Sequence, residues 1–405
     1  MERKSLSIGL FGFGCVGYGL YQVLEKTPTL KTSIKNICVK HPDKKREIPA
    51  SHFTFEKYDL LNDEEINVIV ELIDDADAAF EIVSTALKKG KAVVTANKKM
   101  IAEHLEELLE LQEEYKVPLL YEAACCASIP IIRNLEEYYD NDLLESIKGI
   151  INGSTNYILT KTADEGIGYS EALARAQELG YAESNPILDT GGFDAKYKLM
   201  ILILHAFGVK TTPDQILNLG IDRLGELELN YAREKSLKIK LIAQAYKTED
   251  GNIAAFVIPT FVSKTEKLFT VDDVFNGIIT KTAFADTQFF VGKGAGAYPT
   301  ASAVLSDISA LSYDYRYEYK KLNSKEQIQS YDAIQARILL RFNTDIRGEI
   351  EAHFYTIHET YTNQQEGYII GDISFADLYV ITETYQASTS AILFHTVETR
   401  NEKLV

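Results

Sequence analysis

One glycine pattern restricts the fold of this chain more than any other feature. Gly12, Gly14 and Gly17 have the spacing G-x-G-x-x-G, directly after the apolar run 5–11 and before a helical pattern at 18–25. In this context the first glycine permits a tight turn, the second lets a pyrophosphate approach the backbone, and the third lets the helix pack on the strand. The pattern therefore predicts a dinucleotide site after a buried parallel strand. A glycine-rich turn without a ligand is the alternative.

Strands alternate with helices over the first part of the chain. This alternation predicts a Rossmann-type, doubly wound parallel sheet in an α/β dinucleotide-binding domain at 1–130. The expected later strands are 33–39, 67–73, 92–95 and 118–121, and the expected helices include 78–89 and 102–115.

The pattern changes after about residue 130. We expect a second, mixed α/β domain at 131–299, after which residues 300–320 complete the first domain. Residues 320–329 are polar and predict a linker, and 330–405 predict a small C-terminal α+β domain. Expected helices are 130–140, 170–179, 195–207 and 302–311, and expected strands are 147–152, 237–247 and 253–261.

Composition excludes several classes of protein. The 405 residues carry 42 basic and 59 acidic side chains, a net charge of −17. This balance disfavours nucleic acid and anionic membrane surfaces as partners. Four cysteines do not form a disulfide framework, no apolar run is long enough to span a membrane, and the N-terminus lacks a signal segment. We expect a reduced, cytoplasmic protein.

The segment after the second expected strand selects between the two nicotinamide dinucleotides. An acidic residue here binds the ribose 2′-hydroxyl of NAD, whereas a base accepts the 2′-phosphate of NADP. Lys40 follows the strand directly, and three more basic residues follow within six positions. The sequence favours NADP, with NAD as the alternative.

Two lysines are the other candidates for binding or catalytic residues. Lys98 follows the strand 92–95, at the sheet edge where ligands of open α/β folds bind, although a surface lysine is the alternative. Asp194 and Lys198 are four residues apart at the start of an apolar helix and share one face. A partly desolvated lysine beside an acid can act as a general acid/base. The alternative is an ordinary surface ion pair.

At these motifs the chain resembles homoserine dehydrogenase. The resemblance runs from about residue 6 to 311 and covers GFGCVG at 12–17, VVTANK at 93–98, GIINGSTNYIL at 149–159, AQELGYAESNPILDTGGFDAKYKL at 176–199 and GKGAGAYPTASAV at 292–304. It implies an NAD(P)-dependent oxidoreductase that interconverts L-aspartate 4-semialdehyde and L-homoserine by hydride transfer, a step of threonine and methionine biosynthesis. Another NAD(P)-linked oxidoreductase and a non-catalytic dinucleotide sensor are the competing interpretations.

The resemblance also implies roles for single residues. Lys198 is the implied general acid/base, and Asp194 is implied beside it. The implied substrate-binding residues are Lys98, Gly153, Ser154, Tyr181, Glu183 and Asp189. The implied cofactor-binding residues are Gly12, Phe13, Gly14, Cys15, Val16, Gly17, Lys40, Lys98, Gly294 and Gly296. A structural sodium ion is implied at Glu122 with main-chain carbonyls near Cys125, Ala127 and Ile129.

The chain departs from the family pattern at several positions. Ser154 replaces a threonine but keeps a hydroxyl. Asp74 and Asp75 replace glycines near the nicotinamide ribose, and residues 125–128 replace a glycine-rich stretch at the sodium site. The C-terminal domain has the length of an ACT-like regulatory domain, but Arg347-Gly348 stands where an acid-Arg-Pro-Gly signature is expected. The resemblance further implies a homodimer or a larger homo-oligomer.

Overall fold

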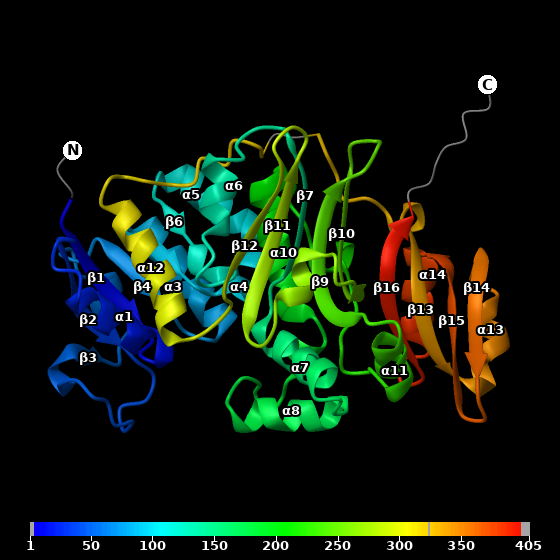
Figure 1. Ribbon diagram of the computed structural model, residues 1–405. Coiled ribbons are helices and arrows are strands. Elements are labelled where there is room, and N and C mark those ends of the chain that lie inside the picture. Colours follow the sequence, from blue (N-terminus) through cyan, green and yellow to red (C-terminus); the bar gives the residue numbers. More distant parts are fainter. Residues whose placement is uncertain (1–3, 323–324, 398–405) are drawn as a thin grey trace. The chain divides into compact units, whose positions relative to one another are not determined.

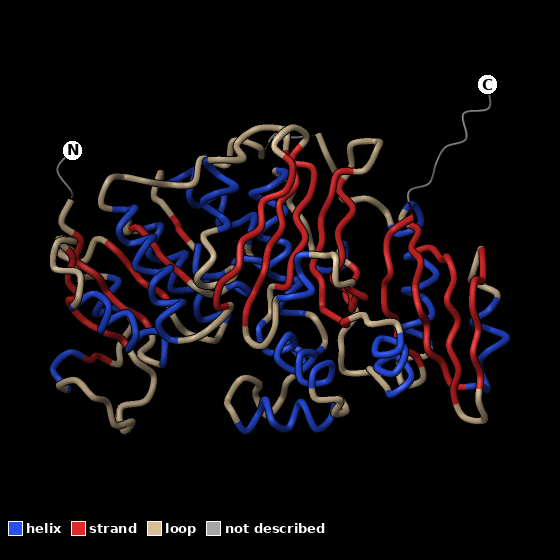
Figure 2. The backbone as a smooth tube through the Cα atoms, in the orientation of Figure 1, coloured by secondary structure: helices blue, strands red, loops and turns tan. Residues whose placement is uncertain are grey.

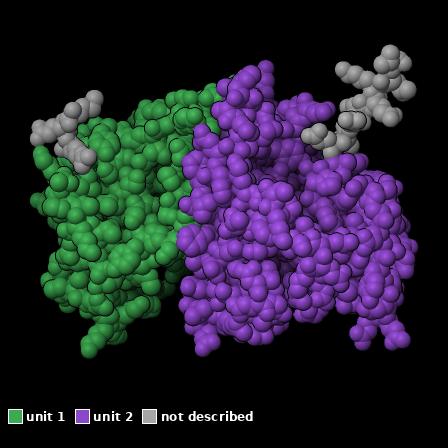
Figure 3. Space-filling model, viewed as in Figure 1, with its two compact units in different colours: residues 1–142, 200–212, 292–324 green, residues 143–199, 213–291, 325–405 purple. Residues whose placement is uncertain are grey.

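The computed structural model describes residues 4–322 and 325–397. The chain divides into two compact units, coloured separately in Figure 3. Unit 1 comprises Met1–Asp142, Met200–Thr212 and Gly292–Ser324, and unit 2 comprises Leu143–Leu199, Pro213–Val291 and Lys325–Val405. In the described part of the chain, no helix is long and apolar enough to cross a membrane.

Unit 1 contains a parallel sheet with the strand order β3-β2-β1-β4-β5-β6. The predicted Rossmann-type sheet is therefore confirmed. The order reverses between β1 and β4, which is where open sheets of this kind bind ligands. Nearly every residue of β1 and β4 is buried, as expected for strands covered on both faces. The strands are β1 Leu6–Phe11, β2 Thr32–Cys38, β3 Phe53–Thr54, β4 Val68–Glu71, β5 Ala92–Thr95 and β6 Leu119–Leu120.

Helices pack around this sheet, and two of them differ from the expected ranges. The expected helix 102–115 is two helices, because the chain leaves helical geometry at His104, whose ring stacks on Phe80 with centroids 3.9 Å apart. The helix expected at 302–311 begins at Ala297, directly after Gly296. The helices of unit 1 include α1 Cys15–Glu25, α2 Tyr58–Leu61, α3 Ala76–Lys88, α4 Lys98–Glu103, α5 Leu105–Tyr115, α6 Ile131–Glu137 and α12 Ala297–Leu311.

A ten-stranded sheet runs through unit 2, in the order β12-β11-β7-β9-β10-β16-β13-β15-β14, with β8 paired to β10. Figure 2 shows these strands in red. Every residue of β10 is buried, which fits its place near the middle of the sheet. The first strands are β7 Leu144–Ile150, β8 Leu217–Asn218, β9 Lys238–Lys247, β10 Ile253–Val262, β11 Phe275–Thr282 and β12 Asp286–Lys293. The helices are α7 Gly153–Asp164, α8 Tyr169–Glu178, α9 Ile187–Thr190 and α11 Glu226–Glu234, together with the first part of α10 Phe193–Phe207, whose residues from Met200 onward belong to unit 1.

The C-terminal part has the chain order β-α-β-β-α-β, drawn from yellow to red in Figure 1. Its four strands are antiparallel neighbours in the order β16-β13-β15-β14, the arrangement of ferredoxin-like folds. These strands extend the sheet of unit 2, because β16 pairs with β10 at Leu393 and Thr260. The elements are β13 Gln335–Asn343, α13 Arg347–Glu351, β14 Thr356–Thr362, β15 Glu366–Ser374, α14 Phe375–Thr384 and β16 Thr389–Val397.

One apolar core joins the C-terminal part to the rest of unit 2. Phe256 on β10 and Phe375 at the start of α14 are both fully buried. Their rings meet edge to face with centroids 5.1 Å apart. The buried side chains around them come from β8, β10, β13, β15 and β16 as well as α14. The C-terminal strands therefore share a core with β10, which favours unfolding of these elements as one cooperative unit.

We predict that Phe375→Ala lowers the free energy of unfolding of unit 2 by about 3–5 kcal/mol, because it leaves a cavity in this core. Urea unfolding measures the change. Tyr379→Ala on the same helix is the control, since Tyr379 is 46% exposed and we expect a loss below about 1 kcal/mol. Equal losses for the two variants would contradict the shared core.

Candidate active site

The first candidate cluster lies in unit 2, at the start of a helix that follows a glycine turn. Gly192 has φ +82°, a left-handed conformation that a side chain disfavours, and α10 begins directly after it. Asp194 and Lys198 lie one turn apart in the first half of this helix. Their side chains are only 5% and 10% exposed. The pair is therefore buried, which excludes the alternative of an ordinary surface pair.

The ammonium group of Lys198 is held at two points. Its Nζ donates to Asp194 Oδ2 at 2.7 Å and to the main-chain carbonyl of Ile151 at 2.9 Å. Ile151 follows β7 directly, so the carbonyl is fixed by the sheet. Both bonds go to fixed acceptors, one on α10 and one on the main chain after β7. The arrangement suits a proton donor whose position is set in advance.

Asn152 connects this pair to a second acid, and the sequence analysis missed it as a functional residue. Its Nδ2 donates to Asp194 Oδ2 and to Asp189 Oδ1, both at 2.7 Å. Its Oδ1 accepts from the backbone N–H of Thr155 at 2.8 Å, so the same side chain caps α7. The expected strand 147–152 ends at Ile150 for this reason. An asparagine before the helical pattern at 153–164 was the signal that could have identified the cap.

The other expected substrate residues surround the start of α7. Gly153 is its first residue, and a Cβ there would lie 2.9 Å from the carbonyl oxygen of Val274. Ser154 Oγ donates to the carbonyl of Tyr181 at 2.6 Å, which ties α7 to the segment after α8. Glu183 is exposed, and its main-chain carbonyl accepts from Gln177 at 2.9 Å. The structure thus brings together Asp189, Asp194 and Lys198, whereas the Glu183 side chain faces solvent.

The glycine-rich loop lies in unit 1, between β1 and α1. Gly12 has φ +92°, and a Cβ there would lie 2.5 Å from the carbonyl oxygen of Leu72. A Cβ at Gly17 would lie 2.4 Å from the carbonyl oxygen of Gly12. Gly14 differs, because a Cβ there would meet no atom of the described residues within 4 Å. Two glycines therefore serve the turn and the packing, and the third leaves open space above the helix start.

That open space suits a phosphate group. Gly14 is the N-cap of α1 and supplies no side-chain hydrogen bond to the helix. The first backbone N–H groups of a helix have no partner within the helix, so an anion can accept from them. Phe13 packs its ring on Phe53 and Cys15 is exposed, while Val16 lies in the first turn of α1. The residues of this loop fit a dinucleotide pyrophosphate.

The segment with Gly294 and Gly296 approaches the same helix within unit 1. Gly296 has φ +124° and is the N-cap of α12. A Cβ at Gly19 on α1 would lie 3.0 Å from the carbonyl oxygen of Ala297, so the two helices pack closely at this end. Tyr298 also donates to Gln22 Oε1 at 2.7 Å. The structure therefore places this loop beside α1.

Basic side chains surround the end of β2. Lys40, Lys44 and Lys45 are exposed. Arg46 instead folds onto its own loop, where its guanidinium donates to the carbonyls of His41 and Lys44 and lies 5.0 Å from the centre of the Phe53 ring. The lysines are thus the cations of this loop that remain directed to solvent.

A buried acid closes the carboxyl edge of the parallel sheet. Glu71 at the end of β4 is fully buried. Its carboxylate accepts from the backbone N–H of Ile73 at 2.6 Å and from Thr95 Oγ1 at 2.5 Å. Burial raises the pKa of this carboxyl group to about 7. Asn97 donates to the carbonyl of Ile73 at 3.1 Å and caps α4, whose first residue is Lys98. Glu71 and Asn97 therefore fix the turn that positions Lys98. Asp75 caps α3 through the backbone N–H of Ala78.

The expected sodium residues have other partners in unit 1. The two carboxylate oxygens of Glu122 accept from the backbone N–H groups of Ile132 and Arg133, and its carbonyl accepts from Cys125 at 3.2 Å. The carbonyl of Ile129 accepts from Ile131 at 2.9 Å. The Glu122 carboxylate therefore holds the start of α6. Ala127 has φ +40°, and Cys125 is fully buried.

No group of three or more His, Cys, Asp or Glu side chains within residues 4–322 and 325–397 could hold a metal ion. A sodium ion at Glu122 and the main-chain carbonyls near Cys125, Ala127 and Ile129 stays a prediction. We derive no step of a reaction from sodium.

Comparison with known proteins gives a consistent result. Residues 12–122 match the family described as "Homoserine dehydrogenase, NAD binding domain", and residues 130–309 match "Homoserine dehydrogenase". The chain is 36% identical over 315 residues to homoserine dehydrogenase of Lactococcus lactis, covering 75% of this chain and 73% of the relative. It is 35% identical over 365 residues to homoserine dehydrogenase of Helicobacter pylori, and this match covers 86% of this chain and 85% of the relative.

Solved structures extend the likeness to the whole chain. A homoserine dehydrogenase from Thiobacillus denitrificans has a TM-score of 0.85 and 27% identity, and the match covers 98% of this chain and 99% of that one. A hyperthermophilic archaeal homoserine dehydrogenase in complex with NADPH has a TM-score of 0.67 and 28% identity, and the match covers 78% of this chain and 99% of that one. The first of these matches includes the C-terminal part.

We predict that Glu71→Gln changes the pH dependence of stability of unit 1. The raised pKa means that the folded state binds this proton more tightly than the unfolded state, whose pKa is 4.5. In the wild type, the contribution of protonated Glu71 to the free energy of unfolding is therefore complete below pH 4.5, and it is lost as the pH rises to about 7. Urea unfolding should show Glu71→Gln gaining about 1–3 kcal/mol on the wild type between pH 5 and pH 8.

Glu64→Gln is the control for this experiment, because Glu64 is exposed on the same unit. Its difference from the wild type should stay constant with pH. A constant difference for Glu71→Gln as well would show that Glu71 does not titrate in this range.

Proposed function

Because the chain belongs to the homoserine dehydrogenase family, we propose that it interconverts L-aspartate 4-semialdehyde and L-homoserine in threonine and methionine biosynthesis. The observation that carries this proposal is the hydrogen-bonded group of Lys198, Asp194, Asn152 and Asp189 on the elements that match the family, in which all but Asp189 are buried. The enzyme is then an oxidoreductase that acts on a CH–OH group with a nicotinamide dinucleotide.

The dinucleotide supplies the hydride donor or acceptor when it is bound. The open space at Gly14 and the uncapped start of α1 support binding of its pyrophosphate there. Gly12 and Gly17 hold the turn in the conformation that this binding needs. Gly294 and Gly296 belong to the same proposed cofactor site, and Gly296 is the N-cap of α12, which packs on α1. Phe13, Cys15 and Val16 contribute backbone N–H groups or contact surface to the loop.

Lys198 performs the proton chemistry in this proposal. As an ammonium it donates a proton to the oxygen of the aldehyde during reduction, and as a neutral amine it takes the hydroxyl proton during oxidation. Asp194 and the Ile151 carbonyl orient Nζ, so the position of the amine is set before the substrate binds. Asn152 donates to the same oxygen, Asp194 Oδ2, and so helps to keep this carboxylate in place. Positioning of this kind lowers the entropy lost in reaching the transition state.

The remaining residues of the cluster bind the substrate. Asp189 and Glu183 supply carboxylates for the substrate ammonium. Ser154, Tyr181 and Gly153 form the wall beside them at the start of α7. Lys98 is proposed to contact both substrate and nicotinamide. Of these groups, Asp189 has the best support, because Asn152 holds it in the same network as Asp194.

Three finer points belong to the same proposal. We propose that the C-terminal part is ACT-like, which its β-α-β-β-α-β order supports. Arg347 donates to Glu351 and to Thr362 at 3.0 Å, so it has a structural use within that part. We also propose a homodimer formed through 131–299. The edge strand β12, with Val291 52% exposed, supports an interface in this region.

We predict that Lys198→Ala lowers kcat at least about 100-fold, because the proton donor is lost. Dinucleotide binding should be retained, since the cofactor loop lies in unit 1. Steady-state rates of homoserine oxidation and fluorescence titration with NADPH measure the two properties. Lys281→Ala, an exposed lysine on unit 2, is the control. Turnover near the wild-type level in Lys198→Ala would refute the role of this lysine.

We also propose that NADP is preferred over NAD, which the exposed Lys40 supports. Lys40→Glu should lower the ratio of kcat/KM for NADP to kcat/KM for NAD about tenfold, because a carboxylate repels the 2′-phosphate and accepts from the 2′-hydroxyl. Lys89→Glu, an exposed lysine elsewhere on unit 1, should leave the ratio unchanged. An unchanged ratio in Lys40→Glu would show that this loop does not select the cofactor.

A further inference from the structure

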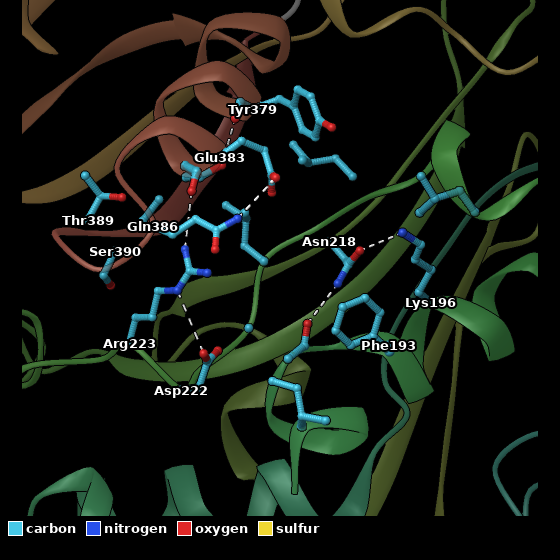
Figure 4. A pocket seen from close by; sticks show the side chains of 18 of the residues that line it. Phe193, Lys196, Asn218, Asp222, Arg223, Tyr379, Glu383, Gln386, Thr389 and Ser390 are labelled. Carbon is cyan, nitrogen blue, oxygen red and sulfur yellow. Dashed lines mark hydrogen bonds and ion pairs between the residues drawn. The ribbon is translucent and has the colours of Figure 1, made fainter. Parts of the chain in front are cut away.

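Three lysines are buried in the described part of unit 2, and two of them lie on α10. Lys198 belongs to the substrate cluster. Lys196 donates to Asn218 Oδ1 at 2.7 Å in the wall of a cavity, where Figure 4 shows these two side chains together. The third is Lys240 on β9, which has no exposed surface. Neither the proposed proton chemistry nor the cofactor loop uses Lys240, so the burial of this charge has another reason.

Three acceptors hold the Lys240 amine. Its Nζ donates to Asn156 Oδ1 at 3.0 Å, to the main-chain carbonyl of Val271 at 2.6 Å and to Asp272 Oδ1 at 2.9 Å. Burial lowers the pKa of this amine, and the Asp272 carboxylate opposes that shift. The three donors of an ammonium group are all used in these bonds, so Lys240 keeps none for a substrate. Its role is therefore to hold the groups around it.

Asn156 on α7 connects this lysine to a loop. Its side chain is buried, its Oδ1 accepts from Lys240, and its Nδ2 donates to the main-chain carbonyls of Val271 at 3.1 Å and of Phe275 at 3.0 Å. The lysine and the asparagine thus share the Val271 carbonyl. Together they tie the loop 271–275 to α7 on one side and to β9 on the other.

The loop 271–275 lies directly against the start of α7. A Cβ at Gly153, the first residue of this helix, would lie 2.9 Å from the carbonyl oxygen of Val274. Thr160 Oγ1, further along the helix, accepts from the backbone N–H of Asp273 at 3.0 Å. At such close packing the helix start cannot shift unless the loop shifts with it. The loop therefore limits the movement of the first turn of α7.

The start of α7 carries the amide that organises the substrate cluster. Asn152, its N-cap, donates to Asp194 and to Asp189, both at 2.7 Å. Asp194 in turn accepts from the Lys198 amine at 2.7 Å. A shift of the helix start therefore moves both the acid that orients Lys198 and the acid proposed to bind the substrate. A misplacement of about 1 Å can lower the rate of a reaction by about 100-fold.

We propose that Lys240 is a positioning residue for the proposed reaction, which acts through Asn156 and the loop 271–275 on the start of α7. A buried charge is costly, and here its three bonds fix one arrangement of loop, helix and strand. The kinetic consequence rests on the proposed function. The mechanical part, in which Lys240 restrains the start of α7, does not rest on it.

Steady-state kinetics of Lys240→Met in the full chain test this proposal. Methionine keeps the volume of the side chain but leaves Asn156 Oδ1 without its donor. We expect kcat for homoserine oxidation to fall at least about tenfold and KM for homoserine to rise at least about threefold, because Asn152 holds both Asp194 and Asp189. The Kd for NADPH should stay within about twofold of the wild type, since the cofactor loop lies in unit 1.

Lys238→Met is the matched control. Lys238 lies on the same strand and donates to both carboxylate oxygens of Asp272, at 2.8 and 2.9 Å, but of these two lysines it is Lys240 that donates to Asn156. We expect kcat and KM of Lys238→Met within about twofold of the wild type. Equal losses of activity in the two variants would show that the lysines only stabilise unit 2 and would overturn the proposal. Unchanged kinetics in Lys240→Met would overturn it as well.

Asn156→Leu tests the route from Lys240 to α7, and it keeps the proposal testable if Lys240→Met does not fold. We expect kcat/KM to fall at least about tenfold in this variant, and the double variant to lie within about threefold of the less active single variant, because both changes break the same connection. Losses that multiply in the double variant would overturn the route. Wild-type kinetics in Asn156→Leu would do the same.

Hydrogen exchange measures the mechanical part without a substrate. In Lys240→Met, amide exchange in peptides that contain residues 153–160 should become at least about tenfold faster, whereas Lys238→Met should match the wild type. Equal exchange in the two variants would overturn the restraint on α7. A wild-type enzyme inactive on homoserine would contradict the proposed function, and the exchange result would still decide whether Lys240 restrains this helix.

Discussion

The buried ion pair of Lys198 and Asp194 is the interaction on which the active-site account depends. Burial of two charges is tolerated when each has further hydrogen bonds, and here the Ile151 carbonyl serves the amine while Asn152 serves the acid. Removal of one partner leaves a charge without compensation. The network therefore fixes the position of the amine before a substrate arrives.

Short local features of the chain create this arrangement. Gly192 allows the chain to enter α10 at an angle that directs Asp194 and Lys198 toward the end of β7. Asn152 ends the strand segment, caps α7 and holds Asp189 and Asp194 with one amide. A single asparagine thus combines a structural role with a positioning role.

The sequence predicted the parallel sheet well because its strands are short apolar runs separated by amphipathic helices, and β5 has the predicted bounds. It did not predict β14 and β16 as separate strands: Thr356–Thr362, for example, is an exposed edge strand with little apolar pattern. The buried state of Lys198 could not be read from its spacing to Asp194, because surface pairs have the same spacing. The family resemblance favoured a catalytic pair over a surface pair. The contact of Lys198 with the Ile151 carbonyl could be seen only in the three-dimensional structure.

A crystal structure of the full chain with a nicotinamide dinucleotide and L-homoserine tests the central claim most directly. The account predicts that Lys198 Nζ lies within about 3 Å of the substrate hydroxyl oxygen, the usual hydrogen-bond distance for a proton donor. It also predicts that the bonds to Asp194 and the Ile151 carbonyl remain. A substrate hydroxyl that contacts a different acid or base, with Lys198 turned away from it, would contradict the account.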